Sequence, residues 1–260
     1  MHTLTLLIRA YDNCHLGMIS ELLESYVEGL KVDLKVQGLS FPGWVQVTVS
    51  GEDERTAMNY LAHEFGQCPT QLEFLQRFSS VRGRMMALNT SEEDVSVDIG
   101  VITPPVAAKV PLFWLQSQLA DGRKVALKKL EELFGFCEGL PVALKVLKVS
   151  VEDRHVEGML AEGQVSLYKS WTRAFLDRLI VIGASVSEVG SALRRAECMR
   201  DVADLESLGL LECAVLCKLG TDAVGLIPKV GRQLRRAVFT VFSPRKVQGF
   251  FDEDSSFLIS

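Results

Sequence analysis

A strict two-residue alternation near the middle of the chain most constrains what this sequence can fold into. Over residues 95–100, the apolar side chains of Val95, Val97 and Ile99 alternate with polar residues or glycine. This period places the three apolar side chains on one face of a β-strand. A slip of one residue would bury Asp98 and expose all three, so the register is well specified. We therefore expect a half-buried strand here, with Asp98 on its outer face.

Neighbouring patterns extend this strand into a small barrel. Residues 81–88 run into a polar turn at 89–94, which makes a hairpin with 95–100, and a third apolar segment ends at 109–112. After an irregular connector that contains Gly122, a long strand over 142–149 turns at 152–154 into 156–160. Five short strands with a connector between the third and fourth are typical of an OB-type β-barrel. We assign residues 79–164 to it.

The segment before the barrel, residues 1–78, has the order strand, helix, strand, strand, helix, strand. Apolar residues between Leu16 and Leu30 recur at steps of three and four, which predicts a helix. Residues 32–36 and 45–49 alternate between apolar and polar side chains, as strands do, and the apolar residues from Met58 to Phe65 predict a second helix. Gln71–Phe78 can supply the last strand. This succession predicts a ferredoxin-like βαββαβ unit.

A similar order returns over residues 165–250. The apolar run 179–182 predicts a buried strand, and Ser185 with Glu188 makes a capping box for the helix that follows. Two strands are expected near 202–208 and 211–218. A helix of about ten residues around Pro228 and a final strand over 238–242 complete the unit. The predicted fold class is therefore α+β, with two ferredoxin-like units flanking a central five-stranded OB-type barrel. In residues 251–260, acids and serines interrupt the apolar residues, which predicts a mobile tail or one held by a partner.

Composition narrows the function classes. No run of eighteen uncharged apolar residues occurs, and the first residues lack the pattern of a signal peptide. We expect a cytoplasmic protein with no membrane contact and reduced cysteines. Sequence motifs of the common hydrolase, nucleotide-binding and zinc-protease classes are missing, and the four histidines are scattered. We therefore expect a non-enzymatic protein with no catalytic residues, no metal and no cofactor.

Two cysteines and two tryptophans have specific expectations. Cys213 and Cys217 lie four residues apart on a predicted strand, about 13 Å, too far to share one ion, so they are expected in the core. Trp171 shares a helical stripe with Leu167 and Phe175, which also favours the core. Trp114 in the connector is the best candidate for an exposed aromatic side chain.

The net charge of −5 argues against extensive nucleic-acid binding, but its distribution is uneven. Between Ala223 and Phe251 there is no acid. Lys229, Arg232 and Arg236 follow at spacings of three and four, which predicts one positive stripe on a helix beginning near Leu226. The stripe is either a polyanion site or simply a solvated face. The candidate RNA-binding residues are Lys229, Arg232, Arg235, Arg236, Arg245 and Lys246 in this region, and Arg82, Arg84, Lys109, Trp114, Arg123, Lys124 and Lys128 around the barrel.

The barrel residues resemble the RNA-binding OB fold named after the first protein of the small ribosomal subunit. The similarity is carried by Gly83-Arg84, 95–100, Val110-Pro111-Leu112 with Leu115, and 144–149. The whole chain resembles an uncharacterised archaeal family of unknown function through 177–179, 208–212 and 217–223. RNA-binding members of the OB family usually place aromatic side chains at the start of the second strand. This chain has Glu92, Glu93, Asp94 and Ser96 there.

Three hypotheses follow. The resemblance implies an RNA-associated protein of translation or RNA handling, with RNA or a ribonucleoprotein as partner. The charge spacing makes the C-terminal basic helix the expected contact, and the barrel is the second candidate contact. The acidic balance and the missing aromatic side chains favour instead a protein-interaction or scaffold protein, in which the barrel is structural. A regulator that binds a small ligand is the third hypothesis.

Overall fold

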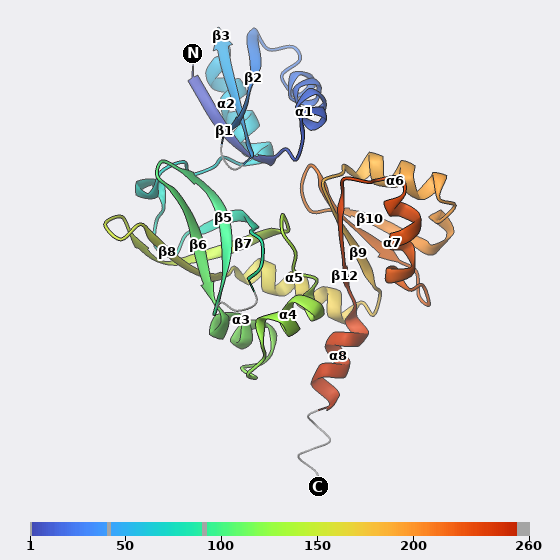
Figure 1. Ribbon diagram of the computed structural model, residues 1–260. Coiled ribbons are helices and arrows are strands. Elements are labelled where there is room, and N and C mark those ends of the chain that lie inside the picture. Colours follow the sequence, from blue (N-terminus) through green and yellow to red (C-terminus); the bar gives the residue numbers. More distant parts are fainter. Residues whose placement is uncertain (1, 41–42, 90–92, 254–260) are drawn as a thin grey trace.

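Three β-sheets, one in each third of the chain, organise the structure, which is a computed structural model that describes residues 2–40, 43–89 and 93–253. In Figure 1 the N-terminal sheet lies at the top, and the barrel and the C-terminal sheet lie side by side below it. The first sheet has the strand order β1-β3-β2, the barrel is closed in the order β4-β5-β6-β8-β7, and the last sheet has the order β10-β11-β9-β12.

The N-terminal unit contains β1 (His2–Arg9), α1 (Asn13–Tyr26), β2 (Val32–Ser40), β3 (Trp44–Gly51) and α2 (Glu54–Phe65). Leu4, Leu6 and Ile8 point to the same side of β1 and are buried against the two helices. The carboxylate of Asp12 accepts a hydrogen bond from the His15 amide and so caps α1. This unit is antiparallel throughout.

The prediction of a last strand over Gln71–Phe78 is wrong. Leu72–Phe74 forms a short 3₁₀-helix, and the pairing with β1 is reduced to one bridge between Leu6 and Gln67. The segment is held by the barrel instead, because the Thr70 amide donates to the Gly100 carbonyl and Leu72 is buried in the barrel core. Burying Leu72 there takes the backbone away from the N-terminal sheet.

The predicted five-stranded barrel is confirmed. Its strands are β4 (Ser80–Met85), β5 (Asp94–Ile102), β6 (Pro105–Pro111), β7 (Pro141–Ser150) and β8 (His155–Leu160), with β6 and β8 parallel and the other pairs antiparallel. Val95, Val97 and Ile99 all point into the core, as expected. The connector between β6 and β7 is more regular than predicted and forms α3 (Leu112–Leu119) and α4 (Leu127–Phe134).

Asp98 does not lie on a solvent-exposed face, contrary to the expectation from the alternation. It is only 6% exposed, and one carboxylate oxygen accepts a hydrogen bond from the Gly100 amide. The chain around Cys68 covers this side of β5, so closely that a side chain on Gly100 would collide with Cys68. A second layer therefore covers the outer face of the strand, which no local period can reveal.

The C-terminal unit contains β9 (Arg178–Ile182), α6 (Val186–Arg195), β10 (Val202–Ser207), β11 (Glu212–Cys217), α7 (Ala223–Gly231) and β12 (Val238–Phe242). All its strand pairs are antiparallel. The predicted capping box of Ser185 and Glu188 begins α6. Cys213 and Cys217 are buried in the core of this unit, as predicted.

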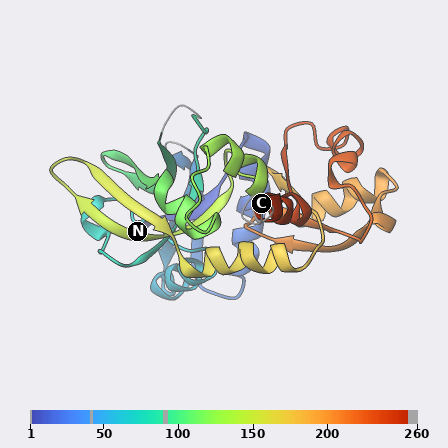
Figure 2. The same ribbon diagram turned by 90° about the horizontal axis from the view of Figure 1, so that it is seen from below.

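Helix α5 (Glu162–Arg173) runs from the barrel to the C-terminal unit (Figure 2). Its Tyr168 and Trp171 rings contact Phe242 at centroid distances of 6.2 and 5.3 Å. Trp171 is thus a core residue, as expected, and the barrel and one side of the C-terminal sheet share a single apolar cluster. Phe175, predicted on the same stripe, lies beyond the helix end and is exposed.

The chain continues past β12 as helix α8 (Pro244–Glu253), which contacts α4 and α5. Residues 251–253, predicted to begin a mobile tail, therefore belong to a helix. Phe250 and Phe251 pack against the core cluster, and the Arg123 guanidinium lies 5.5 and 5.0 Å from their rings. Residues 254–260 lie outside the described part of the chain.

Candidate binding cleft and cationic surfaces

A cleft of about 650 Å³ opens where the three units meet. It is lined by residues of all three units and of α5: Leu7 and Glu64 of the N-terminal unit, Arg82, Arg84 and 140–143 of the barrel, Gln164, Leu167, Tyr168 and Trp171 of α5, and 185–187 and 207–210 of the C-terminal unit. Its volume lies within the range of about 300–1,000 Å³ that is usual for ligand pockets, which often form between domains. The sequence hypotheses did not include this site as a whole, although they named two of its arginines.

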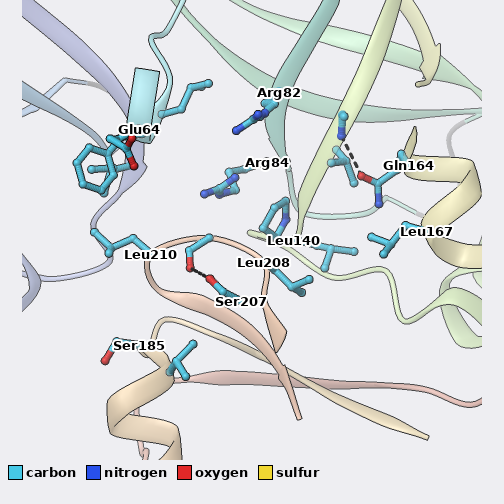
Figure 3. Close-up of a pocket in the computed structure, with 18 of the residues that line it drawn as sticks. Glu64, Arg82, Arg84, Leu140, Gln164, Leu167, Ser185, Ser207, Leu208 and Leu210 are labelled. Carbon is cyan, nitrogen blue, oxygen red and sulfur yellow. Dashed lines mark hydrogen bonds between the residues drawn. The ribbon is translucent and has the colours of Figure 1, made fainter. Parts of the chain in front are cut away.

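The walls of the cleft are mostly apolar, and a few polar groups project into it. Leu140, Leu208 and Leu210 lie below the two arginine side chains in Figure 3, and Leu167 lies farther off on α5. Several polar groups nearby are already bonded within the protein. The Ser207 hydroxyl donates to the Gly209 carbonyl, for example. The two guanidinium groups are therefore the main charged donors of the cleft.

Arg84 of the barrel is bound to Glu212 of the C-terminal unit, and its guanidinium lies 5.9 Å from the ring centroid of Trp44 in the N-terminal unit. Its Nη2 atom lies 3.0 Å from Oε2 of Glu212, and the Tyr11 hydroxyl donates to Oε1 of the same carboxylate at 2.7 Å. Arg84 is 6% and Glu212 1% exposed. Burial, together with the neighbouring Glu212 charge, raises the pKa of Tyr11 far above its usual value and keeps the phenol protonated as a donor. The result is a fixed, charge-balanced junction.

One donor of Arg84 is left over in this arrangement. Its Nε atom is buried and has no hydrogen-bond partner among the described residues. The guanidinium and the Glu212 carboxylate also press against Gly209, where a side chain would collide with the carboxylate. The site thus depends on a glycine in the β10–β11 turn, and Arg84 still has an unused donor.

Arg82 has the same orientation but not the same restraints. Successive side chains of a strand point to opposite faces, so Arg82 and Arg84 lie on one face of β4. Arg82 is exposed and makes no hydrogen bond or ion pair with any described residue. Figure 3 shows both guanidinium groups directed into the cleft. One fixed and one unpaired guanidinium, side by side, suit a carboxylate or phosphate ligand.

The predicted positive stripe on a C-terminal helix is wrong in its geometry. Helix α7 ends at Gly231, so only Lys229 lies on it, and Arg232, Arg235 and Arg236 lie in the loop that follows. Pro228 inside the helix has no amide hydrogen to bond the preceding turn, which favours an early end. We call residues 232–237 the arginine loop.

The six C-terminal cations do not form one surface. The arginine loop precedes β12 and lies beside Asp12, which caps α1, and His15 of that helix, where it lines a groove of about 380 Å³. Arg245 and Lys246 follow the end of β12, on α8. Arg236 is bound to Asp12 at 2.5 Å, whereas Arg232 and Arg235 are exposed and have no ion pair among the described residues. Only part of the predicted set is therefore available to a partner.

The candidates around the barrel are also separated. Lys109 forms an ion pair with Asp94 at 2.8 Å, and Arg123 donates to the carbonyls of Phe250 and Phe251. Lys124 and Lys128 are exposed. Trp114 is not the exposed aromatic residue that was expected: its indole nitrogen is buried, and the neighbouring Phe113 is exposed instead. Glu93 is exposed near the barrel, and Glu92 lies outside the described residues.

Metal-binding clusters and membrane-spanning helices are both missing from the described residues. The described residues contain no cluster of His, Cys, Asp and Glu that could hold a metal ion. Within the same residues, no helix combines the length and apolar composition needed to span a bilayer.

Comparison with known proteins identifies the two outer units. Residues 3–71 match the DUF2110 N-terminal domain, and residues 176–242 match the DUF2110 C-terminal domain. The two matches together cover just over half of the chain, which belongs to the DUF2110 family. This confirms the predicted relation to a family of unknown function. The barrel lies between the matched segments.

Other comparisons add little. No curated protein matches the sequence. A solved structure, the a/eIF2alpha-aDim2p-rRNA complex from Pyrococcus horikoshii OT3, contains a chain 12% identical to this one. That similarity has a TM-score of 0.26 and covers 49% of this chain and 70% of the other. A TM-score this low establishes no shared fold.

Proposed function

We propose that this protein binds RNA without catalysing a reaction and acts in translation or RNA handling in the cytoplasm. The observation that carries the proposal is the arginine loop, where Arg232 and Arg235 are exposed and unpaired among the described residues. They belong to a stretch with no acid between Ala223 and Phe251. Exposed arginines of this kind bind phosphates and release counterions, which gives affinity without sequence preference.

The architecture supports the proposal as an analogy. The strand order of the barrel, with its first strand between the second and the fourth and a parallel pair formed by the third and fifth, is that of an OB fold. We also regard the outer units as ferredoxin-like, complete in the C-terminal unit and without the last strand in the N-terminal one. Such folds serve many functions, so the site must carry the argument.

We place the main RNA contact on the arginine loop and not on the barrel. Near the second barrel strand, Lys109 is paired with Asp94, and Glu93 is exposed. A phosphate backbone would be repelled there. Arg236 is left out of the proposed contact because it already binds Asp12.

The test is RNA binding by Arg232→Gln/Arg235→Gln, measured by fluorescence anisotropy with a labelled single-stranded RNA between 50 and 300 mM salt. The slope of log affinity against log salt is negative, and each lost phosphate contact makes it shallower by about 0.7. The slope of the double variant should therefore be about 1.4 less steep than that of the wild type. Lys124→Gln/Lys128→Gln is the control of equal charge and should behave like the wild type. A wild-type protein without salt-dependent binding, or a control pair that abolishes binding alone, would refute the proposal.

A scaffold function is the second candidate, because Phe74 and Phe78 are 64% and 59% exposed on the segment that enters the barrel. Exposed aromatic side chains of this kind are frequent in protein interfaces. Purification from native extract with and without ribonuclease separates the two functions. Protein partners that stay bound after ribonuclease treatment, and are lost from Phe74→Ser/Phe78→Ser, would favour the scaffold.

A further inference from the structure

We infer that the cleft between the three units binds a phosphorylated ligand of about nucleotide size, with its phosphate on Arg82 and Arg84. This site is separate from the arginine loop, and the inference does not rest on the proposed RNA contact. It begins from the two guanidinium groups that project from one face of β4 into the same cavity (Figure 3).

The charges of the cleft favour an anion. Arg82, Arg84 and Glu64 are the charged side chains among the lining residues, and the charge of Arg84 is balanced by Glu212 behind it. Arg82 remains unpaired among the described residues. The N-cap Ser185 and the first residues of α6 line the same cavity, but the Glu188 carboxylate already caps this helix end, so the arginines supply the positive charge. Glu64 is exposed and can turn towards solvent.

The Arg84 side chain is fixed in one orientation, which favours ligand binding. Glu212, itself bonded by the Tyr11 hydroxyl, holds the Arg84 guanidinium before any ligand arrives, so little side-chain entropy is lost on binding. The buried Nε atom of Arg84 has no partner in the described structure. That atom is inaccessible to a ligand, so Arg84 contributes the orientation of its guanidinium beside Arg82, which is the accessible cation.

The remaining walls determine the size and character of the ligand. A phosphate ion alone would leave most of the 650 Å³ empty. Leu140, Leu208 and Leu210 offer apolar surface next to the arginines, which suits a flat, weakly polar group such as a base. A phosphate joined to such a group is a nucleotide, either free or at the end of an RNA strand.

The test is calorimetric titration of the full-length protein with the four 5′-mononucleotides, their nucleosides and inorganic phosphate. We expect at least one mononucleotide to bind at least tenfold more tightly than its nucleoside and than phosphate. Arg82→Gln should weaken that binding about tenfold or more, because a charge-assisted hydrogen bond is lost. Lys148→Gln, an exposed cation on β7 that does not line the cleft, is the matched control.

Two further arms separate the possible sources and the two sites. A 5′-phosphorylated oligonucleotide that binds more tightly than the mononucleotide, again through Arg82, would identify an RNA end, and the reverse order would identify a free nucleotide. Arg232→Gln/Arg235→Gln should leave mononucleotide binding unchanged. The inference is overturned if none of the four mononucleotides binds, if nucleoside or phosphate binds equally well, or if Arg82→Gln has no effect.

Discussion

The buried junction of Tyr11, Arg84 and Glu212 should contribute strongly to stability, and Arg84→Met measures it. The substitution keeps an apolar stem but removes the charge that lies 3.0 Å from the Glu212 carboxylate. Glu212 is 1% exposed, so it would keep only the Tyr11 hydroxyl as a side-chain partner at this junction. Breaking a buried ion pair by removing one partner costs about 3–5 kcal/mol. We expect a loss in that range from the free energy of unfolding.

The matched variants make this expectation specific. Arg82→Met removes a cation two residues away on the same strand, but Arg82 is exposed and unpaired among the described residues, so the change should be within about 0.5 kcal/mol. Arg84→Met/Glu212→Leu removes both charges. Replacing a buried pair with apolar side chains is often nearly neutral, so the double variant should be more stable than Arg84→Met alone.

Urea unfolding followed by tryptophan fluorescence and circular dichroism is the appropriate assay. The Arg84 guanidinium lies 5.9 Å from the ring centroid of Trp44, so one of the three tryptophans reports on the junction. The reasoning is refuted if Arg84→Met costs less than about 1 kcal/mol. The free energy of unfolding of the single variant Glu212→Leu completes the comparison. The reasoning is also refuted if the double variant loses as much free energy of unfolding as Arg84→Met and Glu212→Leu together, because that result means that the two charges do not interact.

Two other predictions concern the cores. Val97→Asp should cost several kcal/mol in a urea titration because it places an unpaired charge in the barrel core, whereas Ser96→Asp on the opposite face should cost much less; equal losses would contradict the barrel register. Burial raises the pKa of Cys213 to about 12 and that of Cys217 to about 11, whereas Cys14 is exposed. The half-buried Cys137 also has its pKa raised to about 12 by burial, and the other cysteines are buried. One thiol of the native protein should therefore react rapidly with Ellman's reagent at pH 8, and Cys14→Ser should remove that reaction.

The strands of the barrel could be predicted because each depends on a local period. The alternation of Val95, Val97 and Ile99 reflects a core that all three side chains reach from one strand. The same local argument failed for Gln71–Phe78. That segment can alternate as a strand, but burial of Leu72 in the barrel core outweighs its pairing with β1. Choosing between two sheets as partners depends on tertiary packing, which a single-segment pattern does not contain.

The positive stripe failed for a related reason. A spacing of three and four residues places Lys229, Arg232 and Arg236 on one face only while the helix continues. The helix stops at Gly231, three residues after Pro228, and the later arginines follow the loop instead. The proline was visible in the sequence, so an earlier helix end could have been predicted from it.

The cleft could not be predicted because its parts come from different units. Arg84 and Glu212 are 128 residues apart, and Tyr11 and Glu212 are 201 apart. One local signal did exist: Glu212 begins a strand whose other residues, 213–217, are all apolar. A carboxylate at the start of a buried strand needs a partner, because burying an unpaired charge is costly. That requirement implies a buried cation elsewhere in the chain, and the structure supplies it as Arg84, beside the only other guanidinium among the residues that line the cleft.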